Sequence, residues 1–436
     1  MKPDFSPDVL RQRLTSLFPG ELIDDLARER EVVERHRTLD VTMFVWTLIA
    51  GFAAGGEARS IAAYRRSYNI VTGHGLCPSS FYDRFTEDVA DLLGDLLEHA
   101  VEEVAVPHHL SPAFERFRDV VAVDATIVRL HRFLSAFPAT HEGVSGLQLY
   151  LVHHVTEQSV ISAEITDKRT HESTLFKTGA WMRGRLFLLD LGFFKYRRFA
   201  LIDENDGFFV SRLKRSANPL ITEELKEWRG RAIPLVGKRV FDVVDRLDRE
   251  EIDVTVEVSV ERRPYDGNQS VTPKEFRVVG VRDEDADDGY RLYITNLPSE
   301  EFRLGEVNAL YRARWSVELL FRELKSRYEL GAFQSEKEHI VRIQVLAALL
   351  TLVVSRALLR VFVDQASECQ DGATFPPERW ATTFRSVAQL VLLEIAASYG
   401  YLRPNLAEFL YREAQQPAPS RSTLLVEVTA ELCSGF

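Results

Sequence analysis

The chain has 436 residues, of which 45% are hydrophobic and 27% charged, as in an ordinary folded protein with a sizeable core. The formal net charge of −11 argues against a uniformly basic nucleic-acid-binding protein, and three scattered cysteines exclude a disulfide framework or a cysteine zinc site. The opening residues, MKPDFSPDVLRQRL, lack a signal peptide's apolar run, and the apolar run 343–355 is too short for a bilayer, so we expect an intracellular protein without a membrane partner.

Charge is distributed unevenly along the chain. Residues 1–110 contain 11 Lys and Arg against 18 Asp and Glu, whereas residues 168–240 contain 16 against 8. Because local potential governs the binding of phosphate groups, the basic middle segment is compatible with a nucleic-acid partner. Chance clustering of charges on a solvated face explains this segment equally well when it is taken by itself.

The predicted elements indicate a mixed α/β fold flanked by helices. Residues 1–110 carry apolar positions at helical spacing, as in ELIDDLARERE. From Asp119 the chain changes to short apolar runs typical of buried strands, with helices between them: VVAVDATIV, LQLYLVHHV, SVISAEI, RLFLLDLG and GFFVSRL. Residues 240–297 include DVTVEVSVE, whose strict alternation predicts a small antiparallel β unit inserted into the α/β domain. Helices are predicted for the remainder.

The segment YRARWSVELLFRELK, residues 311–325, is predicted to be one helix with an unusual distribution of charge. At about 100° per residue, one stripe of this helix collects a carboxylate among cations, beside the apolar stripe: Tyr311, Arg314, Glu318, Arg322 and Lys325. A surface salt-bridge network is the ordinary explanation of such a stripe. Glu323 falls on the opposite side, so it is expected to be solvated and dispensable for chemistry.

Two aspartates lie where buried strands are predicted. Asp124 interrupts VVAVDATIV and Asp190 ends LFLLD, and a charge in a buried strand is costly unless it is paired or bound to a metal. Together with Glu318 these carboxylates could hold two divalent cations through oxygen ligands. Such a pair of cations activates a nucleophile on one side of a phosphorus atom and stabilises the leaving oxygen on the other.

The spacing Tyr311-x2-Arg314-x3-Glu318-x6-Lys325 resembles the YREK signature of a large family of insertion-sequence DDE transposases. The stretches VDAT, LDLGFF…FFVSRLKRS and YITNLP are similar to that family too, so the resemblance covers about residues 115–355. It implies a ribonuclease H-like catalytic domain with a β insertion between the second aspartate and the glutamate. The implied organisation is as follows: a helical region for DNA-end binding (1–112), the first part of the catalytic domain (113–235), the insertion (236–300), its completion (301–360) and a helical dimerisation region (361–436).

The resemblance also implies a mechanism and partners. Asp124, Asp190 and Glu318 would be the metal-binding triad for two divalent cations, Mg²⁺ or its substitute Mn²⁺, while Tyr311, Arg314 and Lys325 would contact transposon-end DNA. Water would cleave one strand at the element's end, and the freed 3′-OH would attack the opposite strand to form a hairpin. The hairpin would be opened before the regenerated 3′-OH attacks target DNA. The expected partners are double-stranded end and target DNA and a second copy of the chain in a synaptic homodimer, in the cytoplasm at the nucleoid.

Other residues are candidates with open alternatives. Trp315 adjoins the charged stripe and is predicted either to stack on an unpaired base or to pack under the helix, and Arg322 shares the stripe as a DNA contact. His153 and His154 are expected to be structural, because neighbouring strand residues point to opposite faces. Six basic residues are candidate phosphate contacts or solvated charges: Lys195, Arg197, Arg198, Arg212, Lys214 and Arg215.

Two rival functions remain open on the sequence. The first is a metal-dependent DNA nuclease of the same fold that cuts without joining strands. The second is a non-catalytic DNA-binding protein descended from a transposase, which would be indicated by loss of one of the three carboxylates; all three are present.

Overall fold

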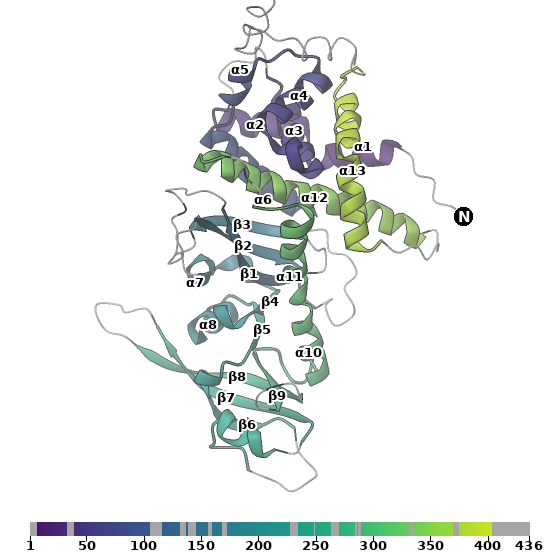
Figure 1. Cartoon of the computed structure of the whole chain (residues 1–436). Helices are drawn as coiled ribbons and strands as arrows, with labels where there is room; N and C mark the ends of the chain where they lie inside the picture. Colours follow the sequence, from purple (N-terminus) through teal and green to yellow (C-terminus); the bar gives the residue numbers. More distant parts are fainter. Residues whose placement is uncertain are drawn as a thin grey trace, which may run out of the picture. The chain divides into compact units, whose positions relative to one another are not determined.

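The computed structural model describes residues 7–32, 39–104, 116–130, 137, 145–155, 159–167, 172–226, 234–247, 249–262, 270–283, 286, 289–331, 333, 335–368 and 375–402. The chain forms two compact units, which are drawn together in Figure 1. One comprises Met1–Leu93 with Val361–Phe436, and the other is Gly94–Arg360. Two helices, α6 (Glu87–Val104) and α12 (Glu338–Glu368), contribute residues to both units.

The first unit is helical throughout its described residues, as predicted. Its core is α3, which is buried along nearly its whole length and packs against α2, α4 and α13. Local sequence starts two of these helices: Asp40 accepts a hydrogen bond from the Met43 amide at 2.8 Å, and Ser60 caps α4 in the same way. The bounds are α1 (Pro7–Leu17), α2 (Gly20–Glu29), α3 (Val41–Ala54), the 3₁₀ turn η1 (Gly56–Arg59), α4 (Ile61–Thr72), α5 (Pro78–Tyr82) and α13 (Pro377–Ser398).

The second unit is built on a nine-stranded sheet with the order β3-β2-β1-β4-β5-β9-β8-β7-β6. The strands are β1 (Asp119–Arg129), β2 (Gly146–His154), β3 (Ser159–Asp167), β4 (Arg185–Leu189), β5 (Phe208–Arg212), β6 (Leu220–Glu224), β7 (Glu251–Glu261), β8 (Val271–Arg282) and β9 (Tyr290–Thr295). Strands β1 to β3 are antiparallel, and β4 and β5 run parallel to β1. This arrangement confirms the predicted ribonuclease H-like fold.

The predicted β insertion is also confirmed, and it extends the same sheet. Strands β6 to β9 pair antiparallel with one another, and β9 joins them to β5. The alternation predicted for β7 is observed, because Val254, Val256, Val258 and Val260 are buried while their neighbours are more exposed. Strand β6 belongs to this antiparallel group although it precedes residue 236 in the sequence.

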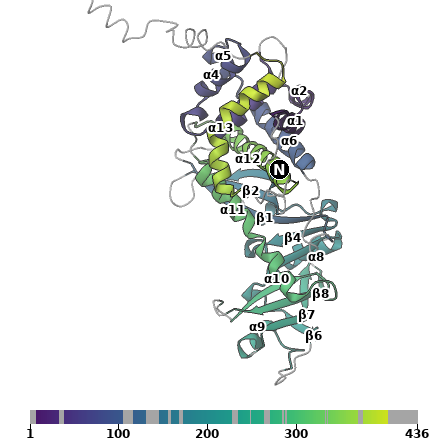
Figure 2. The ribbon, with the colours of Figure 1, turned by 90° about the vertical axis from the view of Figure 1, so that its right-hand side faces the viewer.

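Helices cover both faces of the sheet. One face carries a continuous hydrophobic core that includes Val121, Val123 and Leu189 and is covered by α8 (Tyr196–Glu204). The other face contacts α10 (Leu304–Arg312) at β5 and β8 and α11 (Trp315–Arg322) at β1. A π-helical turn, η6 (Glu323–Arg327), follows α11 directly, and Figure 2 shows α10 and α11 one after the other across the strands of the sheet. The remaining short helices are α7 (Glu172–Leu175), η2 (Ala180–Met182), η3 (Leu191–Phe193), η4 (Arg215–Ala217), α9 (Val240–Val243) and η5 (Val244–Arg246).

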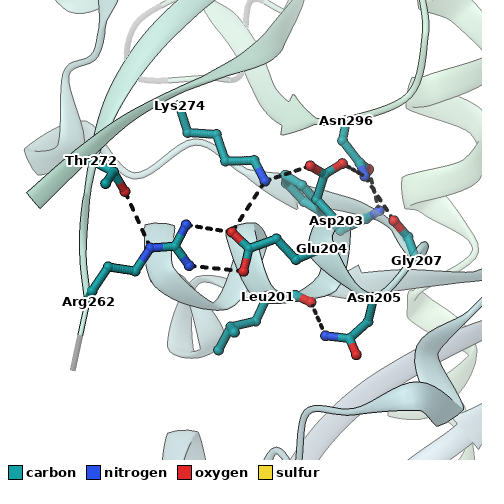
Figure 3. A network of polar contacts seen from close by, with 10 residues as sticks. Leu201, Asp203, Glu204, Asn205, Gly207, Arg262, Thr272, Lys274 and Asn296 are labelled. Carbon is teal, nitrogen blue, oxygen red and sulfur yellow. Dashed lines mark hydrogen bonds and ion pairs between the residues drawn. The ribbon is translucent and has the colours of Figure 1, made fainter. Parts of the chain in front are cut away.

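A polar network fastens the β7–β8 hairpin to α8 (Figure 3). Arg262, which directly follows β7, makes two hydrogen bonds to Glu204, at 2.9 and 2.5 Å, and Lys274 on β8 lies 2.7 Å from Asp203. The Asn296 amide donates to Asp203 and to the Gly207 carbonyl and accepts from the Phe209 amide. Side-chain contacts, as well as the pairing of β5 with β9, therefore hold the inserted strands against the part of the sheet formed by β1 to β5.

Helix α12 explains the apolar run near residue 350. Residues 338–366 are long and apolar enough to cross a membrane by length and composition, but 78% of the most apolar window is buried by the protein itself. A core helix of a folded protein has this character.

Candidate active site

The first two predicted carboxylates come from neighbouring parallel strands. The register pairs Val123 of β1 with Leu189 of β4, so the residues that follow, Asp124 and Asp190, lie at the same level. Neighbouring strands are about 4.8 Å apart. Val123 and Leu189 point into the hydrophobic core, so alternation turns Asp124 and Asp190 to the opposite face, which α11 covers. Both aspartates are half-buried.

The third carboxylate, Glu318, lies on α11, but the predicted single helix is interrupted. Helix α10 ends at Arg312, and the Arg314 amide bonds to the Tyr311 carbonyl at 3.0 Å in a turn before α11 begins. Arg314 and Glu318 still meet across this turn: Arg314 Nη2 donates to Glu318 Oε1 at 2.5 Å. Arg314 Nη1 lies 3.8 Å from Asp124 Oδ2. The arginine therefore joins the carboxylates of β1 and α11.

The environment of Arg314 is strongly anionic. Burial by itself would lower the pKa of the guanidinium, but the hydrogen bond to Glu318 and the charges of nearby groups, Asp190 and Glu318 among them, raise it. The structure therefore places Arg314, whose side chain is 11% exposed, next to Glu318 and Asp124, and Arg314 and Asp190 line the same cavity.

A cavity of about 590 Å³ opens beside Asp190. Its lining is rich in cations and aromatic rings, and we call it the arginine cavity: Asp190, Arg212, Ala286, Arg291, Tyr293, Tyr311, Arg312, Arg314 and Trp315. Tyr311 is only 7% exposed, and its hydroxyl has no hydrogen-bond partner among the described residues. Burial raises the pKa of this hydroxyl, so it stays protonated as a potential donor.

Sequence reasoning did not identify the contribution of β9 to this cavity. Arg291 and Tyr293 are alternate residues of the strand YRLYIT and both line the cavity. Tyr293 pairs with Arg212 of β5 in the antiparallel register. The alternation was visible in the sequence, but only the pairing of β9 with β5 places these side chains beside the carboxylates.

The remaining predicted DNA contacts are more exposed. Lys325 Nζ donates to Thr126 Oγ1 at 2.5 Å, two residues after Asp124 on β1, and partial burial lowers the pKa of the lysine. Arg322 is exposed. Trp315 is 57% exposed, so it is not packed under the helix. Lys325 therefore lies next to the strand of Asp124, while Trp315 is open to solvent at the edge of the cavity.

The expectation that Glu323 is solvated is wrong. Its side chain is 8% exposed and forms a buried ion pair with Arg356 of α12, and burial raises the pKa of its carboxyl. On a helical wheel, Glu323 and Glu318 lie about equally far from the apolar stripe, on opposite sides. Helix α12 covers the side of Glu323, which the local pattern of one helix does not reveal.

The other candidates divide into surface and structural residues. Lys195, Arg212, Lys214 and Arg215 are exposed, and Arg197 is half-buried. Arg198, by contrast, is 6% exposed, donates to the Phe193 carbonyl and stacks over Phe176, and burial lowers its pKa to about 10. It is a core residue rather than a phosphate contact.

The two histidines on β2 are buried, in agreement with the structural role predicted for them. His154 Nε2 lies 2.9 Å from Asp119, which also accepts a hydrogen bond from Arg185 at 2.6 Å. Burial opposes ionisation of Asp119, but these two partners lower its pKa. The group ties together the first residues of β1 and β4 and the end of β2.

The donor chemistry of the three carboxylates suits hard divalent cations. All of the available ligand atoms are carboxylate oxygens, which Mg²⁺ and Mn²⁺ prefer. In the described part of the chain, no three His, Cys, Asp or Glu side chains are grouped as a ligand set. At this site Arg314 contacts Glu318 at 2.5 Å and lies 3.8 Å from Asp124. A cation ligated by both residues would compete with the guanidinium for the same oxygens.

Comparison with known proteins gives one consistent result. A family model described as "Transposase DDE domain" matches residues 115–354. The putative transposase y4zB of Sinorhizobium fredii is 27% identical over 240 residues, which cover 55% of this chain and 59% of that protein's length. The transposase of insertion sequence element IS231F from Bacillus thuringiensis is 20% identical over 382 residues, covering 78% of each chain. A solved synaptic complex of piggyBac transposase with hairpin DNA superposes with a TM-score of 0.47 and 10% identity, over 96% of this chain and 88% of that chain.

Proposed function

Because the chain belongs to the transposase DDE domain family, we propose that it is an enzyme that cleaves DNA at the ends of an insertion sequence and joins the freed 3′-OH to target DNA. Dependence on divalent metal ions is a property of this family. The observation that supports the proposal is the β1–β4 register, which puts Asp124 and Asp190 at one level on neighbouring strands, together with the contact of β1 with α11, the helix that carries Glu318.

The carboxylates are assigned as follows. Asp124, on β1, would be a ligand of both cations, and Asp190 and Glu318 would each be a ligand of one. When bound, two Mg²⁺ ions supply activation of the attacking oxygen and stabilisation of the leaving oxygen. Since Arg314 contacts Glu318 and lies near Asp124, it keeps their negative charges compensated within a half-buried site.

The arginine cavity is proposed to receive the DNA end. Arg314 lines it, so this cation connects the carboxylates to the surface where phosphates enter. Lys325 and Arg322 extend the positive charge on the other side of Glu318. The protonated Tyr311 hydroxyl can donate a hydrogen bond to a phosphate oxygen at the cavity wall, and the exposed Trp315 ring can stack on a base that leaves the duplex at the cleavage point.

The partners follow from this chemistry. The substrates are double-stranded transposon ends and target DNA at the nucleoid in the cytoplasm. Two copies of the chain would hold two ends in a synaptic homodimer. The helical regions at the two ends of the chain are assigned to end binding (1–112) and to dimerisation (361–436).

An end-cleavage assay tests the proposal. The substrate is a labelled duplex carrying the inverted repeat that flanks the reading frame, incubated with the full chain and Mg²⁺. Wild-type protein should produce nicked, hairpin and strand-transfer products, Glu318→Gln should produce none, and the exposed Glu300→Gln control should match wild type. Degradation without sequence preference or joined products would replace the transposase by a nuclease. Binding without any cleavage would replace it by a non-catalytic DNA-binding protein.

A further inference from the structure

The catalytic helix changes its geometry between Glu318 and Lys325. Residues Glu323–Arg327 form a π-helical turn, closed by a hydrogen bond from the Tyr328 amide to the Glu323 carbonyl at 3.1 Å. A second bond, from the Leu330 amide to the Leu324 carbonyl at 2.9 Å, ends the segment. π-Helical turns are rare, occur often at functional sites, and persist where the surroundings hold them.

Two side-chain contacts hold this turn against α12. Glu323, its first residue, forms the buried ion pair with Arg356, and both side chains are 8% exposed. Tyr328, which directly follows the turn, donates from its hydroxyl to Ser355 Oγ at 3.1 Å. Both ends of the turn are therefore fastened to successive residues of one neighbouring helix.

Lys325 lies in the middle of the fastened turn. Its ammonium group contacts Thr126 on β1, the strand that carries Asp124, rather than α12. The rotation of the π turn decides where Lys325 points relative to Glu318, because a π turn advances differently from an α-helical turn. A change in the turn would move the lysine without moving Glu318, which precedes it in α11.

We propose that Glu323 and Arg356 are positioning residues, which act through Lys325 by fixing the π turn that carries it. The proposal rests on the function proposed above, because Lys325 is assigned there to the phosphates beside the cleavage point. The ion pair also has a cost: Glu323 Oε1 and Arg356 Nε and Nη1 have no hydrogen-bond partner among the described residues. A buried ion pair satisfied so incompletely contributes little stability compared with apolar side chains of similar size, so a role in geometry explains it better.

The decisive variant replaces the pair by apolar side chains, Glu323→Met with Arg356→Met. Such replacements of buried ion pairs are commonly neutral or stabilising, so the melting temperature should be unchanged or higher. Affinity for the cognate end should change by less than about twofold, because neither residue contacts DNA. The single-turnover cleavage rate of the bound end should fall about fivefold or more, since an error of about 1 Å can cost a hundredfold.

A double-mutant cycle with Lys325→Ala distinguishes a positioning effect on Lys325 from a general disruption of the fold. If the pair acts through Lys325, adding Lys325→Ala to the apolar pair should lower the rate no further than Lys325→Ala does alone. A control removes an ion pair of the same unit away from the π turn, Arg249→Met with Glu224→Met, whose arginine is 6% and whose glutamate is 26% exposed; it should cleave at the wild-type rate. Arg356→Lys, which keeps the charge but loses the guanidinium fork, should show an intermediate rate and supplies the comparison if the apolar pair fails to fold.

The outcomes decide the proposal in each direction. Cleavage by the apolar pair within about fivefold of wild type, or losses that multiply in full with Lys325→Ala, would overturn it. If the apolar pair is unfolded, a wild-type rate for Arg356→Lys overturns it instead. Failure of wild-type protein to cleave any end would refute the proposed function, and the wild-type reaction is measured first for that reason.

Discussion

Two glutamates of the segment 311–327, Glu318 and Glu323, each form an ion pair with an arginine, and the two pairs differ in burial. Arg314, which lines the arginine cavity, and Glu318 are four residues apart, and 35% of the glutamate side chain is exposed. Glu323 and Arg356 are 33 residues apart, and both are buried. The first pair leaves a carboxylate accessible to substrate and metal, whereas the second is enclosed between helices. The comparison shows that the neighbouring elements decide the role of a charged helix residue. A side that is left open can present its charge to a ligand, whereas a side covered by another helix can only use its charge in a structural contact.

The largest expected effect is loss of the accessible carboxylates. Asp124→Asn, Asp190→Asn and Glu318→Gln should each lower end cleavage by at least about a thousandfold, because each removes a proposed ligand of the metal ions that would stabilise charge in the transition state. Chelation of divalent ions with EDTA should have the same effect on wild-type protein. Gel-shift affinity for the end should stay within severalfold. A triad variant that cleaves normally would remove that residue from the site.

Breaking the buried Glu323–Arg356 pair should lower the free energy of unfolding, and the loss should depend on pH. Arg356→Met leaves the Glu323 carboxylate buried without its cation, which typically costs about 3–5 kcal/mol. Burial already raises the pKa of Glu323, and Arg356 is the main group that lowers it, so the variant's pKa is higher still. A carboxyl whose folded pKa is raised stabilises the fold below its unfolded value of 4.5 and loses that contribution as pH rises through the folded pKa.

Denaturant unfolding from pH 4 to 8 measures this dependence. The deficit of Arg356→Met relative to wild type should be greatest at neutral pH and should narrow as the pH falls towards 4.5, where Glu323 becomes neutral. A deficit that is constant with pH would show that packing, and not charge, is what the substitution disturbs. The exposed variant Arg322→Met is the matched control and should unfold like wild type at every pH.

Features set by residues close together in the sequence could be predicted, whereas features set by contacts between distant segments could not. The positions of Asp124 and Asp190 at the strands β1 and β4 and of Glu318 on a helix could be predicted because local patterns mark buried strands and helix faces, while their role as metal ligands stays a prediction. The alternating valines of β7 marked the insertion. The partner of Glu323 was not, because Arg356 lies on another helix and no local pattern indicates which side of α11 that helix covers. The break before α11 and the π turn after it escaped prediction too, since both depend on tertiary contacts rather than on propensity.

A smaller effect should follow loss of the local cation. Arg314→Ala should lower cleavage and joining of a cognate end about a hundredfold, because the guanidinium both compensates Glu318 and lines the cavity where phosphates enter. Stability should change by no more than about 1 kcal/mol, as expected for a pair with a partly exposed member. Affinity for random duplex should fall only severalfold, with about one unit less salt dependence. Equal losses on cognate and random DNA would reduce Arg314 to a nonspecific contact.

The smallest effect is expected at Trp315, which tests how far the accessible side of the segment extends. Its ring is 57% exposed, so Trp315→Ala should leave the free energy of unfolding within about 0.5 kcal/mol of wild type. If the ring stacks on a base displaced at the cleavage point, its loss should lower the cleavage rate roughly tenfold, which corresponds to about 1.4 kcal/mol, near the lower end of what such stacking contributes. An end with a mismatch at that position is already unstacked and should restore most of the rate, because the displacement then costs less. Trp315→Phe keeps an aromatic face and should lie between the two. Equal rates of wild type and Trp315→Ala on paired and mismatched ends would exclude stacking and confine the accessible side to the residues that border Glu318.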